Sequence, residues 1–362
     1  MNRIVFYDFN SINHSSYFLD GLSKNQREYN YRLAVSKGTP KFLLGTALDQ
    51  DWQKSLFAIS VFKASFGGDE FFFCIDTLDS ALREEGYNIP LLKEVDFYFK
   101  VNYNATAIKN DRVLHKLSQK IFPTTPFCPL GIPGIWKYFP RILSNANTGW
   151  TFQDAKARIK RLPNLQNLDQ LRAMRSAPKH IDVFFVMEYY ANDLHPEVTK
   201  MRHQIVSALL DNPRISTVAG LISNRGLPEE FAHLRIERFS QKTYFELLAS
   251  SKLAIYVRGP HDCLSFKLAE YLALGKPIVG QKLLNNTRTL NQHPHFSEQF
   301  AYEDAESIVA QIEYLIQQPE KLEVLAKSNA EVFDAHLTPK TAVSNILDQI
   351  ISPDTQSMAL LG

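Results

Sequence analysis

Polar side chains gather at one point of the segment from Leu253 to Gly280, directly after a short apolar run. Residues 253–257 predict a buried strand, and Arg258, His261 and Asp262 follow it closely. In an open parallel sheet, ligands bind beyond the carboxyl ends of the strands. We therefore expect these three side chains to face a ligand.

A helix is predicted next, over residues 264–274, and its first turn is suited to an anion. The unpaired backbone N–H groups and the positive dipole end at a helix start favour a group such as a diphosphate. Ser265 and Lys267 lie in this turn, and the Lys267 ammonium could add a mobile charge. Glu270, three residues further on, could accept hydrogen bonds from vicinal hydroxyls. The alternative is a surface ion pair between Lys267 and Glu270.

The segment resembles the donor-binding signature of GT-B glycosyltransferases. In that signature an acidic residue, seven intervening residues and a Glu precede a small apolar run and Gly-x-Pro, and Asp262, Glu270 and Gly275-Lys-Pro stand at those positions. The run from Asp262 to Lys267 is also similar to the Asp-x-x-Ser-Phe-Arg/Lys pattern of exostosin-type members. A Lys in this helix is similar to the one that holds donor phosphates in fucosyltransferase-like enzymes.

The resemblance implies a binding site for a nucleoside diphosphate sugar. Glu270 would bind the donor ribose, Asp262 the sugar or its phosphates, and Ser265 and Lys267 the diphosphate. Arg258 would help to stabilise the diphosphate leaving group.

One phosphate motif of retaining members is missing. Gly-Arg-x-x-x-x-Lys-Gly does not follow the apolar run that begins at Ile181. Arg202 and Arg225 are the candidate replacements, and the alternative for each is a solvated helix or loop residue.

Short runs of Val, Ile and Phe alternate with amphipathic stretches along the chain, which predicts an α/β fold with parallel strands and helical crossovers. The expected strands are 4–9, 31–35, 71–76, 95–101, 120–122, 181–187, 215–221, 235–237, 253–257 and 277–279. The expected helices are 196–210, 241–250 and 264–274, and the chain after Glu303 is expected to be helical with breaks at Pro319 and Pro339.

A chain of 362 residues is long enough for two α/β lobes. The resemblance implies a GT-B fold, with two Rossmann-like domains, a deep cleft between them and C-terminal helices. We expect an N-terminal acceptor-binding domain over 1–150, a helical connector over 151–178 and a nucleotide-sugar-binding domain over 179–335. Residues 336–362 form a further helix, which in one arrangement packs back on the N-terminal domain.

The catalytic base is less well defined. An inverting enzyme needs a carboxylate or His to take the proton of the acceptor hydroxyl, and a retaining one can lack it. Asp76 and His14 lie near ends of predicted strands and are the candidates, with Asp8 beside them; the alternative is that they cap loops. Lys100, late in a predicted strand, is a candidate contact for an anionic acceptor or donor.

Composition excludes several classes of protein. The net charge is only +2, with 40 basic and 38 acidic side chains, so nucleic acid is not an expected partner. Three widely spaced cysteines without C-x-x-C pairing predict neither a disulfide framework nor a zinc site. We expect no metal and no cofactor apart from the donor substrate. Dinucleotide-binding and P-loop motifs are also missing from the sequence.

No leader or membrane-spanning run is visible, so a cytoplasmic protein is expected. The basic stretch 156–161, near Trp150 and Phe152, could lie on anionic lipid, which would make the protein peripheral at the inner membrane face. The alternative is a solvated connector.

Together these features predict transfer of a hexose-type sugar from a nucleoside diphosphate sugar to a hydroxyl of a glycan or lipid-linked glycan. Two alternatives stay open: a nucleotide-sugar epimerase on the same fold, and a catalytically silent glycan-binding protein.

Overall fold

The computed structural model describes residues 2–7, 11–36, 56–139, 165–190, 195–223, 226–286, 290 and 293–352. The chain divides into two compact units, residues 1–165 with 335–362, and residues 166–334. Arg225, Asp8 and the basic stretch 156–161 with its neighbours Trp150 and Phe152 lie outside the described residues. Each unit is an α/β structure, so the predicted fold class is confirmed.

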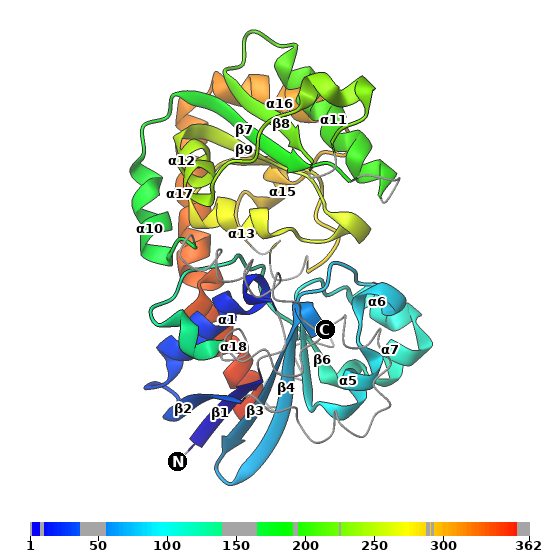
Figure 1. Cartoon of the computed structure of the whole chain (residues 1–362), viewed down its shortest axis with the longest axis vertical. Coiled ribbons are helices and arrows are strands. Elements are labelled where there is room, and N and C mark those ends of the chain that lie inside the picture. Colours follow the sequence, from blue (N-terminus) through cyan, green and yellow to red (C-terminus); the bar gives the residue numbers. More distant parts are fainter. Residues whose placement is uncertain are drawn as a thin grey trace. The chain divides into compact units, whose positions relative to one another are not determined.

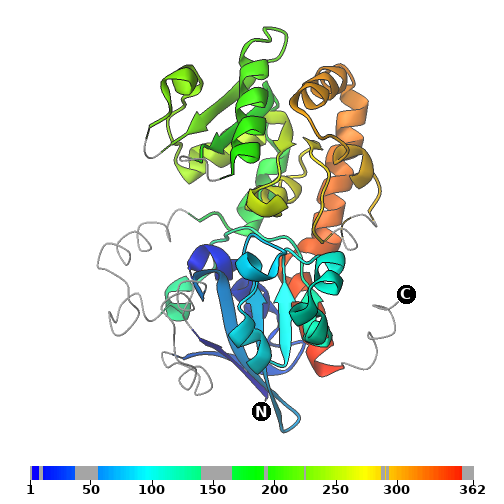
Figure 2. The same cartoon turned by 90° about the vertical axis from the view of Figure 1, so that its right-hand side faces the viewer.

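The first unit contains a six-stranded sheet (Figures 1 and 2). Its order is β2 (Tyr31–Ser36), β1 (Asn2–Tyr7), β3 (Ile59–Phe66), β4 (Asp69–Asp76), β5 (Phe97–Lys100) and β6 (Ile121–Pro123). The pairs β1–β2, β4–β5 and β5–β6 are parallel, as predicted. β3 runs antiparallel to both β1 and β4.

The sequence analysis did not predict β3. It forms a hairpin with β4 across Gly67 and Gly68, and both glycines have positive φ angles, 62° and 103°. Two glycines between apolar runs are a recognised hairpin signal, because they adopt such angles without steric cost. This signal would have revealed the strand.

The helices of the first unit are α1 (Ile12–Asn25), α4 (Arg83–Gly86), α5 (Ile89–Glu94), α6 (Ala105–Asn110), α7 (Arg112–Lys116) and α18 (Pro339–Ile351). α18 packs along α1 although more than 300 residues separate them in the chain (Figure 1). The contact is close: a Cβ on Gly21 would lie 2.0 Å from the Pro339 carbonyl oxygen. Asn25 Nδ2 donates to the Lys340 carbonyl at 2.8 Å.

The second unit contains a parallel sheet of four strands. Its order is β10 (Ile278–Gly280), β9 (Ser251–Tyr256), β7 (Ile181–Glu188) and β8 (Thr217–Ile222). All three pairs of strands are parallel, which confirms the predicted parallel sheet for this unit. The predicted strand at 235–237 is wrong: only Arg235 makes an isolated bridge, to Leu221. Charged residues on both sides of Ile236 leave too short an apolar run for a buried strand.

The helices of the second unit are α10 (Leu168–Ala173), α11 (Pro196–Leu210), α12 (Gln241–Ser250), α13 (Phe266–Ala273), α15 (Phe296–Gln299), α16 (Ala305–Ile316) and α17 (Pro319–Val332). α11 and α12 have the predicted bounds. The predicted breaks at Pro319 and Pro339 are confirmed, because α17 and α18 begin there. Among the described residues, no helix has both the length and the apolar character needed to cross a bilayer.

Candidate functional site

A loop connects the carboxyl end of β9 to the start of α13. α13 begins at Phe266, two residues later than predicted, because Ser265 is its N-cap. The Ser265 hydroxyl accepts a hydrogen bond from the Lys267 backbone N–H at 3.1 Å. The Leu268 N–H donates to the Ser265 carbonyl at 3.1 Å, so Ser265 satisfies two N–H groups of the first turn.

Lys267 and Glu270 are joined through Tyr244 of α12. Lys267 Nζ donates to the Tyr244 hydroxyl at 3.0 Å and lies 4.5 Å from the centre of its ring. The same hydroxyl donates to Glu270 Oε2 at 3.0 Å. The two candidate residues therefore belong to one hydrogen-bonded cluster on neighbouring helices. Tyr244 was not among the predicted site residues, because it lies outside the motif and only the tertiary contact brings it to Lys267 and Glu270.

Burial dominates the electrostatics of this cluster. It raises the pKa of Glu270 above its usual value, an effect that the Lys267 charge and the Tyr244 hydrogen bond oppose. It lowers the pKa of Lys267 to about 8, although Glu270 acts in the opposite direction; the charge of Arg202 adds to the lowering. An anion bound beside Lys267 would favour its charged form.

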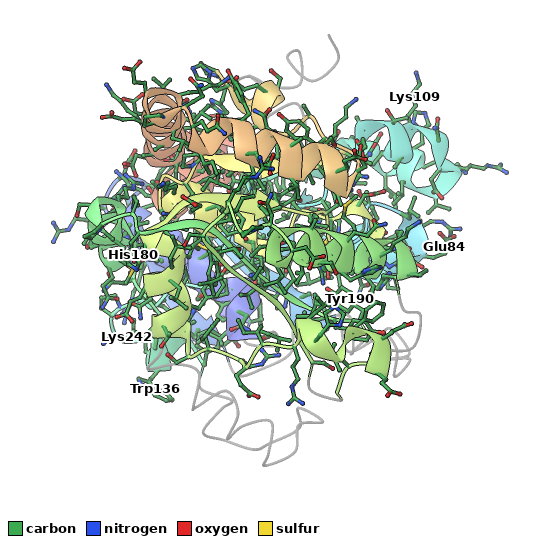
Figure 3. The ribbon with its side chains drawn as sticks, turned by 90° about the horizontal axis from the view of Figure 1, so that it is seen from above. Glu84, Lys109, Trp136, His180, Tyr190 and Lys242 are labelled. Carbon is green, nitrogen blue, oxygen red and sulfur yellow. The ribbon has the colours of Figure 1, made fainter. Side chains whose placement is uncertain are left out.

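Arg202 of α11 is buried, with 4% of its surface exposed. Its Nη1 donates to the Glu188 carbonyl at 2.6 Å, at the end of β7, and its guanidinium lies 4.7 Å from the ring centre of Tyr190, which is labelled in Figure 3. Its Nε has no hydrogen-bond partner among the described residues. A buried guanidinium with an unsatisfied donor is costly unless a ligand pairs with it.

His195 and His261 meet edge to face, with ring centres 4.9 Å apart and an angle of 82° between the rings. Both have positive φ angles, 98° and 55°. His195 is the residue before Pro196, the first residue of α11, so the start of this helix lies beside the loop that precedes α13. We missed His195 as a site residue, although a His followed by Pro at a helix start marked its position.

Arg258 and Asp262 are paired with each other. Arg258 Nε lies 3.0 Å from Asp262 Oδ1, and Arg258 Nη2 lies 2.9 Å from Glu303 Oε2. Two carboxylates thus already balance the Arg258 charge. Arg258 is therefore less available to a phosphate than Lys267 or Arg202 is.

Asp76, a candidate base in the first unit, is fully buried. Lys100 Nζ donates to Asp76 Oδ1 at 3.0 Å, and the Tyr98 hydroxyl donates to Asp76 Oδ2. Lys100 also donates to the Leu78 and Gly86 carbonyls. Both side chains are fully buried, so neither Asp76 nor Lys100 is exposed to an acceptor. Their hydrogen bonds hold the loop after β4 in place.

His14, the other candidate, lies in the first turn of α1 and is only half-buried. Its Nδ1 is 2.7 Å from the Thr77 hydroxyl oxygen, in the residue that follows Asp76. The structure thus brings the two candidates to the same edge of the sheet, with His14 the more accessible. A ring nitrogen fixed by a hydroxyl is suited to proton transfer at the other nitrogen.

The comparisons with known proteins agree with the motif. Residues 202–348 match the family model described as glycosyl transferase-like, so the chain carries a glycosyl transferase-like domain in this range. The match includes Arg202, Asp262, Lys267 and Glu270. No curated protein matches the chain.

Among solved structures, Anabaena Alr3699/HepE in complex with UDP-glucose is 11% identical, with a TM-score of 0.47, and the alignment covers 97% of this chain and 100% of that one. The UDP-GlcNAc 2-epimerase of Neisseria meningitidis bound to UDP-GlcNAc is 14% identical, with a TM-score of 0.42 and coverage of 96% and 99%. S. aureus TarM, in a complex that includes UDP, is 7% identical, with a TM-score of 0.44 and coverage of 77% and 50%. Likeness at this level says nothing about substrate.

Proposed function

We propose that the second unit binds a nucleoside diphosphate sugar and that the protein transfers its hexose-type sugar to a hydroxyl of a glycan or lipid-linked glycan. The observation that carries this proposal is the buried Arg202 guanidinium, whose Nε lacks a partner among the described residues, electrostatically coupled to Lys267. The match of residues 202–348 to a glycosyl transferase-like model supports the same reading.

A diphosphate fits the charges of this site. Arg202 is a buried cation and Lys267 a partly buried one, and the carboxylates of Glu270 and Glu188 act on Lys267. The start of α13 adds the positive end of its dipole. A bound diphosphate would neutralise both cations and give Arg202 Nε an acceptor. It would also offset the Arg202 charge, which adds to burial in lowering the pKa of Lys267.

Glu270 is proposed to bind the ribose. Its carboxylate accepts from the Tyr244 hydroxyl at 3.0 Å, and a carboxylate has further acceptor sites for vicinal hydroxyls. Tyr244 would then hold Glu270 in the orientation that the ribose requires. Lys267, fixed by the same hydroxyl, would be left facing the phosphates.

Catalysis in this proposal consists of charge stabilisation and positioning. As the bond between the sugar and the diphosphate breaks, negative charge grows on the leaving group, and preorganised donors stabilise it. Lys267, Arg202 and the start of α13 would supply these donors without a metal ion. If the reaction inverts the sugar configuration, His14 is the proposed base for the acceptor hydroxyl.

The test is binding of nucleoside diphosphates by calorimetry, followed by incubation with labelled nucleotide sugars. Lys267→Met should weaken binding of the preferred diphosphate by about tenfold or more, because a charge-assisted hydrogen bond is lost. Glu270→Ala should weaken nucleotide binding as well and leave the fold intact.

Lys242→Met is the matched control. Lys242 lies on α12, 75% of its side chain is exposed, and Figure 3 shows it pointing outward. Its loss should leave affinity unchanged. Undiminished affinity of the Glu270 and Lys267 variants would refute the site. If the free nucleotide sugar is epimerised, the protein is an epimerase instead. If no nucleotide binds, the protein is the catalytically silent alternative.

A further inference from the structure

A hollow of about 500 Å³ lies in the second unit, away from the start of α13. It is formed by α17, by the segment that precedes β7, by the first residues of β9 and by the turn between α13 and β10. Its lining residues are Arg175, Lys179, Lys252, Leu274, Gly275, Lys276, Pro277, Pro319, Leu322, Glu323, Ala326, Lys327 and Ala330. A volume of this size suits a small ligand.

Because Lys252 is the second residue of β9, this hollow lies at the amino edge of the sheet, whereas the candidate donor site lies at the carboxyl edge. The two sites therefore cannot hold parts of the same small molecule. A ligand in the hollow would be distinct from the donor.

The lining combines apolar side chains with an excess of basic ones. Five lining residues are basic and Glu323 alone is acidic. Three of the five have a carboxylate partner: Arg175 Nη1 lies 2.6 Å from Asp334, Lys252 Nζ lies 2.7 Å from Asp182, and Lys327 Nζ lies 3.9 Å from Glu331.

Lys179 and Lys276 have no carboxylate partner among the described residues. Each amine is hydrogen-bonded to backbone carbonyls and to the other amine. Lys276 is 1% exposed; its Nζ donates to the Ala249 carbonyl at 2.7 Å and to the Ser251 carbonyl. Lys179 donates to the same Ala249 carbonyl at 2.6 Å and to the Lys276 amine. Burial, followed by the Lys179 charge, lowers the pKa of Lys276 to about 6.

We propose that this hollow binds a single free amphiphile, an alkyl or acyl chain with one anionic head group. The head group would lie against the exposed Lys179 ammonium, next to the buried Lys276 amine, and the chain would cover Leu322, Ala326 and Pro277. An anion there would supply the negative charge that Lys179 lacks. A flat bilayer surface fits less well, because the lining residues form a concave hollow of about 500 Å³.

Calorimetry with octyl sulfate tests the proposal, since its head group does not titrate near pH 7.5. Inorganic sulfate and octanol serve as the separate halves of the probe. Octyl sulfate should bind saturably, and each half should bind about tenfold more weakly or worse. Equal binding of either half would overturn the amphiphile assignment.

Location is tested by filling the hollow. Ala326→Trp should weaken octyl sulfate binding by about tenfold or more, whereas Val324→Trp, at an exposed position of the same helix, should leave it unchanged. Equal affinity in both variants would overturn the site. So would binding to anionic phospholipid vesicles that Ala326→Trp does not affect, because that result assigns the surface to a bilayer.

Proton linkage tests the position of the head group. Burial and then the Lys179 charge lower the pKa of Lys276. An anion beside Lys179 offsets this charge and raises the pKa of Lys276, so binding at pH 7.5 should take up protons. Titrations in two buffers with different ionisation enthalpies measure this uptake, and its absence would overturn the contact with Lys179. Nucleotide binding plays no part in these measurements, so the outcome is independent of the proposed donor site.

Discussion

At the scale of single residues, buried charges distinguish structural roles from roles in binding. Lys100 and Asp76 neutralise each other, and every bond that they make is internal to the first unit. Burial raises the pKa of Asp76 and lowers that of Lys100, while the opposite charge of each partner acts against the shift. Among the residues that the structure describes, Arg202 Nε instead has no acceptor. The first arrangement satisfies its buried charges internally, and the second leaves one donor for a ligand.

Asp76→Asn is therefore expected to destabilise the protein rather than to affect catalysis alone. Removing one charge of a buried pair leaves Lys100 uncompensated, and the cost is about 3 kcal/mol or more. Urea unfolding measures it, with Asp69→Asn, at the exposed start of the same strand, as the control. An unchanged unfolding free energy together with lost transfer activity would restore Asp76 as the base.

At the scale of elements, the turn between α13 and β10 links the helix of the candidate donor site to the sheet. Gly275 has a φ of 59°, and a Cβ there would lie 3.0 Å from Ala330 Cβ and 3.1 Å from the Ala326 carbonyl oxygen. The turn thus needs glycine for two reasons, its left-handed backbone and the close approach of α17.

Gly275→Ala compared with Gly67→Ala separates these two reasons. Gly67 has a nearly equal φ of 62° but nothing within 4 Å of its would-be Cβ. Gly67→Ala should cost about 1 kcal/mol of unfolding free energy for the backbone alone. Gly275→Ala should cost about 1 kcal/mol more, because α17 must move. If urea unfolding shows the same loss of unfolding free energy for both variants, α17 can move away from the added Cβ without a measurable cost.

At the scale of the whole molecule, the candidate donor site belongs to one unit. The residues that form it come from α11, α12 and α13 and from the ends of β7 and β9, all within 166–334. The first unit holds His14 instead. The chain therefore separates the proposed donor chemistry from the proposed acceptor chemistry.

Amide hydrogen exchange, measured with and without the preferred nucleoside diphosphate, tests whether the second unit alone binds the donor. The largest protection is expected in the first turns of α11 and α13 and in the loops after β7 and β9, because backbone N–H groups there would bind the ligand. β1 and β2 of the first unit should change least. Protection centred on the first unit would mean that the nucleotide binds elsewhere.

The sequence by itself determined the fold class, most strands and the bounds of α11 and α12, because apolar periodicity and helix-start residues are local signals. It also led to Glu270 and Lys267, since their spacing along one helix is a sequence property. β3 was not predicted, although Gly67 and Gly68 form a turn between two apolar runs and so indicate a hairpin.

Only the tertiary structure decided which charged groups meet. Tyr244 joins Lys267 to Glu270 from a different helix, and α18 joins α1 across most of the chain. Asp76 looked accessible at a strand end, yet Tyr98 and Lys100 enclose it. The hollow around Lys276 depends on four separate segments. Contacts between distant segments arise from packing and from burial, which no local pattern encodes, and these contacts fix the charge state and accessibility of each candidate residue.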